Sequence, residues 1–502
     1  MSKTKDDEKV TTPFPTAPIS NGEWVPNIQV SKKQVLAHQL TMEECDVQAK
    51  RHAMTRAQFL RTAAATMIGF SVLNKINGLD AWGDNAVLPV MKVHCEDLDA
   101  ASERLSTKPY FIVDVQSHFV DAEEFNIGAF CSLLRFCNEP GDPTCAEDAT
   151  RVGQTNYIKE MFVDSETHVG VISGLPSGVP LGQEKAAETR DLVNSMANSE
   201  RCIIQAMIDP APPSIPNPNF RTGIDSMEFQ VNTLGGRAIK CYSYNGNWRL
   251  DDENIAYPMF AEAERLGIGL INTHKGLPAI FAPGSEEAVR TTDYPKALAD
   301  WPKLRFCAYH SGYFTAGQHP EGKDGVTEFV EMAAALPKKH RKRLYAEIGS
   351  SFAITLLSDD GTLACGNGGP PPVGPVNTAH FIGQLLNTFG SKNILWGTDS
   401  IWWGSPQWLL DAFKIMQIPV SLQEQFGYPE LKERDKKRIL GKNASKLYRI
   451  KRSTRNNLCS IPEDQLQQAQ VARGGAHASR SLDVYGPMTR SGFIHKFGTS
   501  IG

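Results

Sequence analysis

The chain has 502 residues, more than one compact core usually needs, so we expect either one large domain with extensions or two domains. Its composition, 41% hydrophobic and 22% charged residues, is that of an ordinary globular protein. The net charge of −4 and the mixing of both signs exclude a surface built for nucleic acid or acidic membranes. No run of about 18 apolar residues is present, so no membrane span is predicted.

We interpret residues 1–108 as an N-terminal extension, polar at first and then helix-like from Val35 to Leu73. Within it, Thr55–Arg61 and the apolar run that follows resemble a twin-arginine export signal. Ala57 stands where the second arginine belongs, and the segment begins about fifty residues into the chain, deeper than a usual signal. We therefore expect this segment to stay attached as a helix in a cytoplasmic protein. A working signal would instead place the protein in the periplasm.

Residues 109–450 show a regular alternation. Short apolar runs rich in β-branched and aromatic residues alternate with segments that have a helical pattern. Eight strand-like runs are Phe111–Val115, His168–Ser173, Cys202–Ile208, Ala238–Tyr242, Gly269–His274, Leu304–His310, Leu344–Ile348 and Asn393–Gly397. Eight such strand–helix units predict an α/β fold, a (β/α)8 TIM barrel with insertions. An open doubly wound sheet is the alternative, but no Gly-x-Gly-x-x-Gly turn follows the first run.

The remaining residues, 451–502, contain few apolar clusters and form a C-terminal tail in our interpretation. Each extension could be disordered or could drape over a partner subunit. Because neither has an evident core of its own, we expect self-association, as a homodimer. Among the ten cysteines, Cys131, Cys137 and Cys145 lie close enough in one loop for a disulfide, and the sequence leaves open whether one forms.

The first strand-like run ends in three polar residues, Asp114, Gln116 and His118. Side chains two apart on a strand share a face, so these groups are predicted to point the same way out of a buried strand. Buried polar groups need partners, and a bound cation is one such partner for an imidazole. The alternative is a strand end whose polar groups meet the next loop.

If the fold is a TIM barrel, polar residues at the ends of the predicted strands are candidates for an active site, because active sites in this fold lie at the C-terminal ends of the strands. The polar residues at those ends are Gln116, His118, Lys240, His274, His310, Glu347 and Asp399. One histidine at a strand end is most often structural, but three of them together with an aspartate favour a metal site. Neutral imidazole and carboxylate suit a borderline divalent ion such as zinc.

Several motifs on these strands resemble one known family. They are Asp-x-Gln-x-His at 114–118, Asn-Thr-His-Lys-Gly at 272–276, Tyr-His-Ser-Gly at 309–312, Leu-Trp-Gly-Thr-Asp-Ser at 395–400 and Ile-Leu-Gly-Lys-Asn-Ala-Ser-Lys-Leu-Tyr at 439–448. Together they are similar to the amidohydrolase superfamily, more narrowly the amidohydrolase-related branch that includes aminocarboxymuconate-semialdehyde decarboxylase. The resemblance covers about Pro109 to Ile450.

The resemblance implies that Gln116, His118, His274 and Asp399 bind one divalent metal, and that His310 is the acid–base or substrate-polarising group. Gln116 departs from the usual His-x-His pair. An amide oxygen is a weaker zinc ligand than imidazole, so metal affinity falls or the preference moves toward harder ions such as manganese.

This set of residues predicts a metal-dependent hydrolase acting on a small organic acid, amide or lactone. A metal in an open site lowers the pKa of bound water and supplies hydroxide. Asp399 could accept a proton from that water, and His310 could stabilise an oxyanion or protonate the product. The same parts serve a non-oxidative decarboxylase. A further alternative is a non-catalytic subunit that has lost its metal.

Other residues near the strand ends are weaker candidates for contact with substrate. Lys240 could pair with a substrate carboxylate, or could be satisfied by neighbouring carboxylates in the barrel. Trp402 and Trp403 could wall a pocket or pack on a helix, and Glu347 could orient a ligand by hydrogen bonding. The loop Leu363–Pro372 could be a lid over the site or a simple insertion.

Overall fold

The structure is a computed structural model, and its coordinates describe most of the chain. The described residues are 32–79, 86–106, 110–121, 153–178, 180–212, 221–278, 284–315, 317–357, 374–400, 402–403, 405–451, 453–454, 461–462, 464–466 and 468. The three cysteines considered for a disulfide, Cys131, Cys137 and Cys145, lie outside these residues, as does the loop at 363–372.

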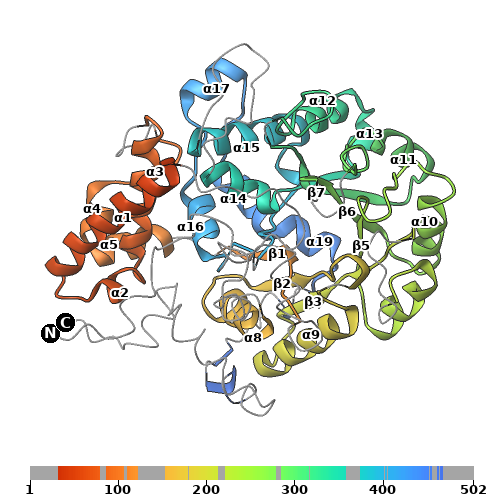
Figure 1. Cartoon of the computed structure of the whole chain (residues 1–502), viewed down its shortest axis with the longest axis horizontal. Coiled ribbons are helices and arrows are strands. Elements are labelled where there is room, and N and C mark those ends of the chain that lie inside the picture. Colours follow the sequence, from red (N-terminus) through yellow and green to blue (C-terminus); the bar gives the residue numbers. More distant parts are fainter. Residues whose placement is uncertain are drawn as a thin grey trace.

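Parallel strands form the centre of the protein (Figure 1). They are β1 Val113–Ser117, β2 Val169–Ile172, β3 Cys202–Ile204, β4 Ala206–Met207, β5 Ile239–Tyr242, β6 Leu270–Gly276, β7 Arg305–Tyr313, β8 Leu344–Glu347 and β9 Ile394–Leu395. Only Gln205 separates β3 from β4, so these two occupy one of eight strand positions. Each paired strand lies beside its neighbour in chain order, and all seven pairings are parallel.

Backbone hydrogen bonds join the strands into a closed ring. At the seam between the last and first strands, the N–H of Val115 donates to Trp396 O and the N–H of Asp399 donates to Gln116 O, each at 3.0 Å. Across the other break, Gln205 N–H donates to the second strand at 3.0 Å. The (β/α)8 TIM barrel predicted from the alternation of runs is thereby confirmed, and the open sheet is excluded.

Helices and short helical turns surround the strands in Figure 1. In chain order they are α8 Gln154–Ile158, η1 Lys159–Val163, η2 Pro176–Gly178, α9 Gln183–Ala197, η3 Ile224–Ser226, η4 Phe229–Thr233, α10 Ala256–Arg265, α11 Tyr294–Asp300, α12 Thr327–Ala335, α13 Lys338–Arg341, α14 Gly349–Leu357, α15 Pro375–Phe389, η5 Ser391–Asn393, α16 Gln407–Ile415, α17 Val420–Phe426, α18 Glu433–Lys437, η6 Arg438–Lys442 and α19 Asn443–Leu447.

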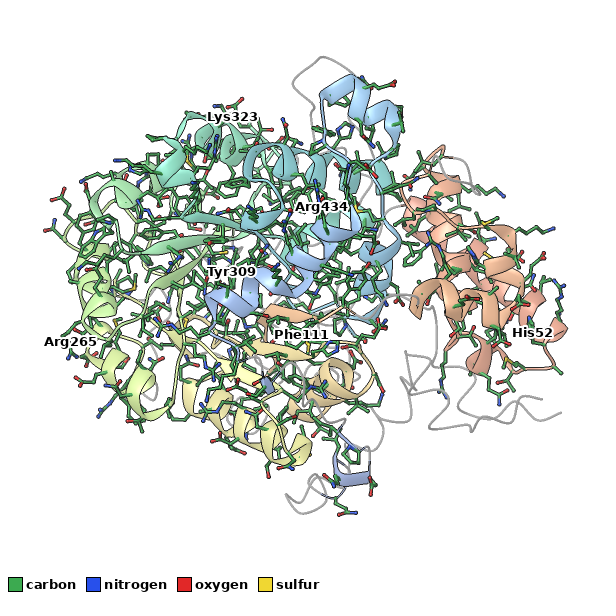
Figure 2. All side chains as sticks on the ribbon, turned by 180° about the vertical axis from the view of Figure 1, so that it is seen from behind. His52, Phe111, Arg265, Tyr309, Lys323 and Arg434 are labelled. Carbon is green, nitrogen blue, oxygen red and sulfur yellow. The ribbon has the colours of Figure 1, made fainter. Side chains whose placement is uncertain are left out.

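Side chains fill the barrel interior, so it is a core and not a pore. Val113 and Val115 alternate along β1 and pack with Val171 and Tyr309 in one buried cluster, as the period of a strand requires. Tyr448, just after α19, belongs to the same cluster, and its hydroxyl lies 3.1 Å from that of Tyr309. Figure 2, seen from behind, places Tyr309 near the centre of the ring of strands.

The N-terminal helices pack on one another beside the barrel, where Figure 1 draws them in red and orange. They are α1 Lys32–Arg51, α2 Arg56–Phe59, α3 Ala63–Ile76, α4 Lys92–Glu96 and α5 Leu98–Ser106. The helix expected over Thr55–Leu73 is interrupted, because Thr55 caps α2 and Thr62 caps α3 by accepting from Ala65 N–H at 3.3 Å. No helix within the described ranges is both long and apolar enough to cross a membrane.

Candidate active site

Four predicted site residues meet at the C-terminal end of the barrel, although they are far apart in the sequence. Gln116 and His118 come from the end of β1, His310 from the end of β7, and Asp399 follows β9. All four side chains are fully buried. The amide nitrogen Nε2 of Gln116 lies 2.9 Å from Asp399 Oδ1 and 3.3 Å from His310 Nε2, so this one amide contacts two of the other three.

His118 directs one ring nitrogen at Asp399. Its Nδ1 donates to the carbonyl oxygen of Ser173 at 2.8 Å, which leaves Nε2 as the nitrogen with the lone pair in the neutral ring. That Nε2 lies 3.4 Å from Asp399 Oδ1. Two electron-rich atoms face each other there, so a proton on His118 or a cation near both atoms stabilises the pair. The ring of Trp402 stacks on His118, with 5.9 Å between centroids.

Asp399 is oriented by its backbone and by hydrogen-bond donors. Its φ of 58° lies in the left-handed region, which a non-glycine residue adopts only when surrounding structure enforces it. Ser350, at the start of α14, donates its hydroxyl to Asp399 Oδ2 and accepts a hydrogen bond of 2.8 Å from Trp403 Nε1. The carboxylate is therefore held on both oxygens, by Gln116 on one and by Ser350 on the other.

His310 lies on a similarly strained segment at the end of β7. His310, Ser311 and Gly312 all have positive φ, at 64°, 54° and 61°. Glu347 on the next strand accepts a hydrogen bond of 3.0 Å from the backbone N–H of His310. The hydroxyl of Ser351 donates to His310 O at 2.9 Å. These contacts fix the turn that points the imidazole toward Gln116. The role of Glu347 in orienting a ligand stays a prediction.

The contact between Gln116 and His310 fixes which ring nitrogen of His310 carries a proton. An amide NH2 has only hydrogens to offer, so His310 Nε2 accepts from it and is the nitrogen with the lone pair. A histidine in this state can take a proton from water or substrate and return it later.

Two further carboxyl groups lie beside the cluster and are shifted toward their neutral forms. Burial, reinforced by the charge of Asp399, raises the pKa of Glu347 well above its usual range. Burial also raises the pKa of Asp114 to about 7, although hydrogen bonds from Thr398 and from Gln116 N–H lower it in part. Both carboxyl groups beside Asp399 are therefore shifted toward the neutral form relative to exposed carboxyl groups.

A glycine before Asp399 makes room for this arrangement. A Cβ at Gly397 would lie 2.1 Å from Glu347 Oε1 and 3.2 Å from Gln116 Cβ. Real Cβ atoms do not approach other atoms that closely, so any side chain at position 397 would displace the Glu347 carboxyl. The glycine of the Trp-Gly-Thr-Asp segment thus follows from packing at the seam of the barrel.

One ring nitrogen of His274 contacts a backbone carbonyl oxygen. Nε2 of His274 lies 3.0 Å from Leu277 O, in a turn where Leu277 has a φ of 40°. Its ring packs edge-on against His310, with centroids 4.6 Å apart, and against Tyr244 at 4.8 Å. As placed, His274 supports the His310 ring, and its role as a metal ligand stays a prediction.

Lys240 lies inside the barrel, fully buried. Its ammonium group lies over the ring faces of Tyr242 and Tyr309, at 4.3 and 4.1 Å from the centroids. Its charge also lowers the pKa of Glu347 slightly, against the larger effect of burial. Cation–π contacts thus stabilise this lysine. Its proposed contact with a substrate carboxylate stays a prediction.

The donor atoms of these residues meet the requirements of the predicted metal only in part. In the described part of the chain, no three His, Cys, Asp or Glu side chains gather closely enough to hold an ion. Two donor atoms are nevertheless spaced as metal ligands. His118 Nε2 and Asp399 Oδ1 lie 3.4 Å apart, which is the distance expected between two ligand atoms that each bind a tetrahedral metal at about 2.1 Å. The amide oxygen of Gln116, turned inward, would supply a third. The donors therefore fit a weakly held ion of the harder kind.

The structure adds residues that the sequence motifs missed. Ser350 and Ser351 contact Asp399 and His310 from the first turn of α14, and Ser350 accepts from Trp403, a residue already named from the sequence. Their only sequence signal was small polar residues directly after the seventh strand, which many loops also have. Trp402, predicted as a pocket wall, does contact a site residue, His118.

Comparison with known proteins gives one family match. A family model described as Amidohydrolase matches residues 186–450. No curated protein matches the chain.

Several solved structures resemble the chain at low identity. A 5-carboxyvanillate decarboxylase from Novosphingobium aromaticivorans, complexed with manganese, is 12% identical over 69% of this chain and 97% of its own, with a TM-score of 0.44. A 2,6-dihydroxybenzoate decarboxylase from Rhizobium is 14% identical over 68% and 99%, with a TM-score of 0.40. A probable 2-pyrone-4,6-dicarboxylic acid hydrolase from Acinetobacter baumannii is 11% identical over 68% and 100%, with a TM-score of 0.37. Such likeness does not transfer a reaction.

Proposed function

Because the chain belongs to the amidohydrolase family, we propose that it is a metal-dependent hydrolase acting on a small organic acid, amide or lactone. One observation supports the proposal most directly. Four buried side chains lie together at the C-terminal ends of the strands, those of Gln116, His118, His310 and Asp399. This is the end of a TIM barrel at which active sites lie.

His118 through Nε2 and Asp399 through Oδ1 would hold the metal, with the amide oxygen of Gln116 as a third ligand and His274 as the fourth ligand of the sequence prediction. When bound, a divalent ion such as zinc or manganese lowers the pKa of a water molecule toward neutrality and polarises a carbonyl group. The mixed nitrogen and oxygen donors favour manganese more than an all-histidine set would.

Asp399 acts as the general base in this proposal. Its Oδ1 faces His118 and Gln116, so it lies on the side of the carboxylate where a water molecule would meet the other site residues. The hydrogen bond from Ser350 to Oδ2 keeps the carboxylate from rotating. A base held in one orientation takes up the proton of an attacking water without first reorganising.

His310 completes the reaction as the group that delivers a proton. Its Nε2 carries the lone pair and faces the Gln116 amide, so it can receive the proton taken from water and pass it to the leaving nitrogen or oxygen. Once protonated, the ring also stabilises negative charge on a carbonyl oxygen. Trp402 would wall the substrate pocket beside His118, and Lys240 would attract a carboxylate.

The test is a screen of the purified protein, loaded in turn with zinc and manganese, against small amides, lactones and aromatic carboxylic acids in water enriched in oxygen-18. Hydrolysis puts the heavy isotope into the product carboxylate. Release of carbon dioxide without the label would identify the alternative, a carboxy-lyase. Absence of any turnover together with absence of bound metal would leave the non-catalytic subunit as the function.

We also propose a homodimer, for a reason that the N-terminal helices supply. Val47 on α1 is 57% exposed, Met91 beside α4 is 57% exposed and Val93 is 45% exposed. A contiguous exposed apolar patch is typical of a contact surface, and in this proposal these side chains form part of one. Multi-angle light scattering at micromolar concentration should give twice the chain mass, and a monomer would contradict the proposal.

We propose, further, that the segment resembling an export signal stays attached and that the protein is cytoplasmic. Most of α3 is buried, including Met67, Ile68 and Phe70, so cleavage after it would remove part of the hydrophobic core. Mass spectrometry of the protein from its native cells should find residues 55–73. A mature N-terminus between positions 81 and 88 would overturn the proposal.

A further inference from the structure

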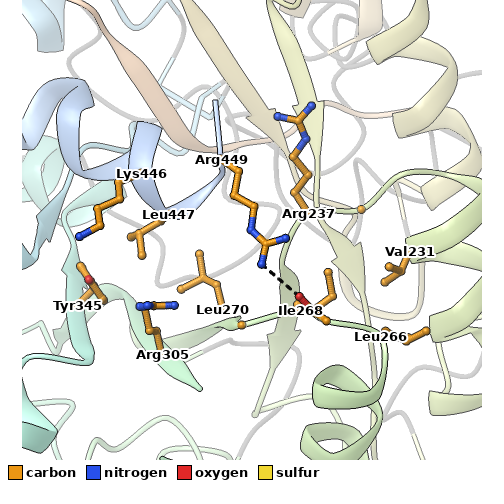
Figure 3. A pocket seen from close by; sticks show the side chains of 13 residues that line it. Val231, Arg237, Leu266, Ile268, Leu270, Arg305, Tyr345, Lys446, Leu447 and Arg449 are labelled. Atoms are coloured by element: carbon orange, nitrogen blue, oxygen red, sulfur yellow. Dashed lines mark hydrogen bonds between the residues drawn. The ribbon is translucent and has the colours of Figure 1, made fainter. Parts of the chain in front are cut away.

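A cavity of about 540 Å³ lies at the end of the barrel opposite the candidate active site (Figure 3). Leu270 and Arg305, the first residues of β6 and β7, line it, and so does Tyr345 near the start of β8. Parallel strands all begin at the same end of a barrel, whereas the site residues lie where the strands finish. The cavity is therefore separate from the proposed active site.

The walls of the cavity carry positive charge. Of the thirteen lining residues, four are basic and none is acidic, and the basic ones are Arg237, Arg305, Lys446 and Arg449. In Figure 3 Lys446 and Arg449 come from α19 and the residues directly after it, and Arg237 and Arg305 come from two other segments around the same opening. Arg237 forms an ion pair with Glu200, and Arg449 donates to Gly267 O at 3.4 Å, so these two are partly committed.

The other two cations lack a carboxylate. Neither Arg305 nor Lys446 forms an ion pair with any residue that the structure describes, and both are exposed. Arg343, which is close to Arg305, does not line the cavity and donates to the backbone oxygens of Trp301 and Leu304, each at 2.9 Å. Basic side chains thus line the cavity without an acidic one among the lining residues, and their mutual repulsion is reduced when an anion binds.

The rest of the lining is apolar. Val231, Leu266 and Ile268 form one wall, and Leu447 and the ring of Tyr345 lie nearer the cations. A bare inorganic anion would leave this apolar surface wet, whereas an organic body would cover it. A guanidinium binds carboxylate and phosphate oxygens alike in pairs, but a phosphate has a further oxygen and more negative charge for a second cation. The presence of Lys446 beside Arg305 therefore favours a phosphate over a single carboxylate.

We propose that this cavity binds a small phosphate ester, with its phosphate at Arg305 and Lys446 and its apolar or ring-bearing body against Leu266 and Ile268. The volume of about 540 Å³ is within the range of cavities that hold such small molecules. No chemistry is assigned to the ligand, since the thirteen lining residues include no carboxylate, histidine, serine, threonine or cysteine.

Isothermal titration calorimetry on the full chain in low salt tests this proposal with three probes: AMP, adenosine and inorganic pyrophosphate. We expect AMP to bind most tightly, because it alone offers both a phosphate and a ring. The variant R305A/K446A should weaken AMP binding by tenfold or more, about 1.4 kcal/mol. The matched control R434A/K442A removes two exposed cations outside the cavity and should change the affinity less than twofold.

The other outcomes overturn the proposal. No heat with AMP at millimolar concentration would remove the site. If adenosine binds as tightly as AMP, the cations do not contribute to the affinity. If pyrophosphate binds as tightly as AMP, the apolar wall does not contribute to it. Equal losses in the cavity variant and the control would reveal a general charge effect. Circular dichroism melting curves of both variants check that folding is unchanged.

Discussion

Nε2 of Gln116 donates a hydrogen bond of 2.9 Å to Oδ1 of Asp399, which lies 283 positions further along the chain. In the family that the motifs resemble, a histidine nitrogen would point at a metal from position 116. Here the amide nitrogen of Gln116 donates hydrogen bonds to Asp399 and His310. This neutral donor partly stabilises the negative charge of Asp399, as a bound cation would. Binding a metal then requires the amide to turn over and to give up both contacts.

This competition predicts that replacing Gln116 with histidine strengthens metal binding. The variant restores the His-x-His pair, supplies a better zinc ligand and removes the competing donor. We expect at least tenfold higher affinity for zinc by calorimetry and a higher metal content after dialysis. The control Gln116→Asn keeps an amide on a shorter side chain and should gain nothing. Equal affinity in wild type and Gln116→His would mean that residue 116 does not face the metal.

Replacing His310 with glutamine should lower the rate without emptying the metal site. His310 contacts Gln116 and delivers protons in the proposed mechanism, and general acid–base groups contribute about 10²- to 10⁴-fold. We therefore expect kcat to fall by that range while the metal content stays within error. Loss of metal in His310→Gln would make His310 a ligand and would require the assignment of roles to change.

Much of this site was predictable because strand ends in a barrel converge whatever their distance in sequence. Gln116, His118 and Asp399 meet for that reason. The orientation of His274 was not predictable, since it depends on a turn in which Leu277 has positive φ. Ser350 could not be found either, because its role depends on a hydrogen bond to a residue 49 positions away. Helices and strands can be predicted from the periodic spacing of apolar residues, but side-chain contacts between distant residues produce no such spacing.

The same contrast holds for the fold. The eight apolar runs specified the barrel because each strand must bury both faces. The packing of the N-terminal helices escaped prediction, since α1 and α3 bury their apolar residues against each other through contacts that no local pattern encodes. Thr62 breaks the expected helix because its side chain caps the next one.

Ser350→Ala should weaken catalysis without unfolding the barrel. The change removes the hydroxyl that holds Asp399 Oδ2 and leaves Trp403 Nε1 without this acceptor. Hydrogen bonds to charged groups are worth about 1.5–3 kcal/mol, so we expect kcat to fall by about tenfold or more. Ser445→Ala, which removes a buried hydroxyl that donates to Gly441 O far from the site, is the matched control. Similar kcat losses in both variants would argue for a general structural effect.

Gly441→Ala should destabilise the whole domain. A Cβ at position 441 would lie 1.9 Å from Phe111 O, a backbone atom that cannot move without shifting β1. We expect a loss of about 3 kcal/mol or more in the free energy of unfolding, measured in urea. Gly269→Ala is the control, because the nearest atom to its added Cβ is an Arg305 nitrogen at 3.6 Å. A normal stability for Gly441→Ala would show that η6 can move away from β1.

The last prediction concerns pH and rests on His168. Burial, with the nearby charge of Arg201, lowers the pKa of His168 to about 4 from the model-peptide value of 6.5. Its Nδ1 accepts a hydrogen bond of 3.1 Å from Ile112 N–H, which only the unprotonated nitrogen can do. At a pH between these two pKa values, His168 is mostly protonated in the unfolded chain and mostly neutral in the folded chain. The contribution of His168 to stability is therefore complete above pH 6.5 and is lost as the pH falls toward 4.

Subtraction of two unfolding curves isolates this effect. Buried carboxyls such as Asp114 and Asp411, whose pKa values are raised to about 7, titrate with the opposite sign, but they are present in both proteins and cancel between wild type and His168→Gln. The advantage of wild type over the variant should shrink by about 2 kcal/mol between pH 7.5 and pH 5, because each pH unit below 6.5 removes about 1.4 kcal/mol. A difference that stays constant with pH would mean that His168 has the same pKa in the folded and unfolded states, and that the Ile112 contact does not hold it unprotonated.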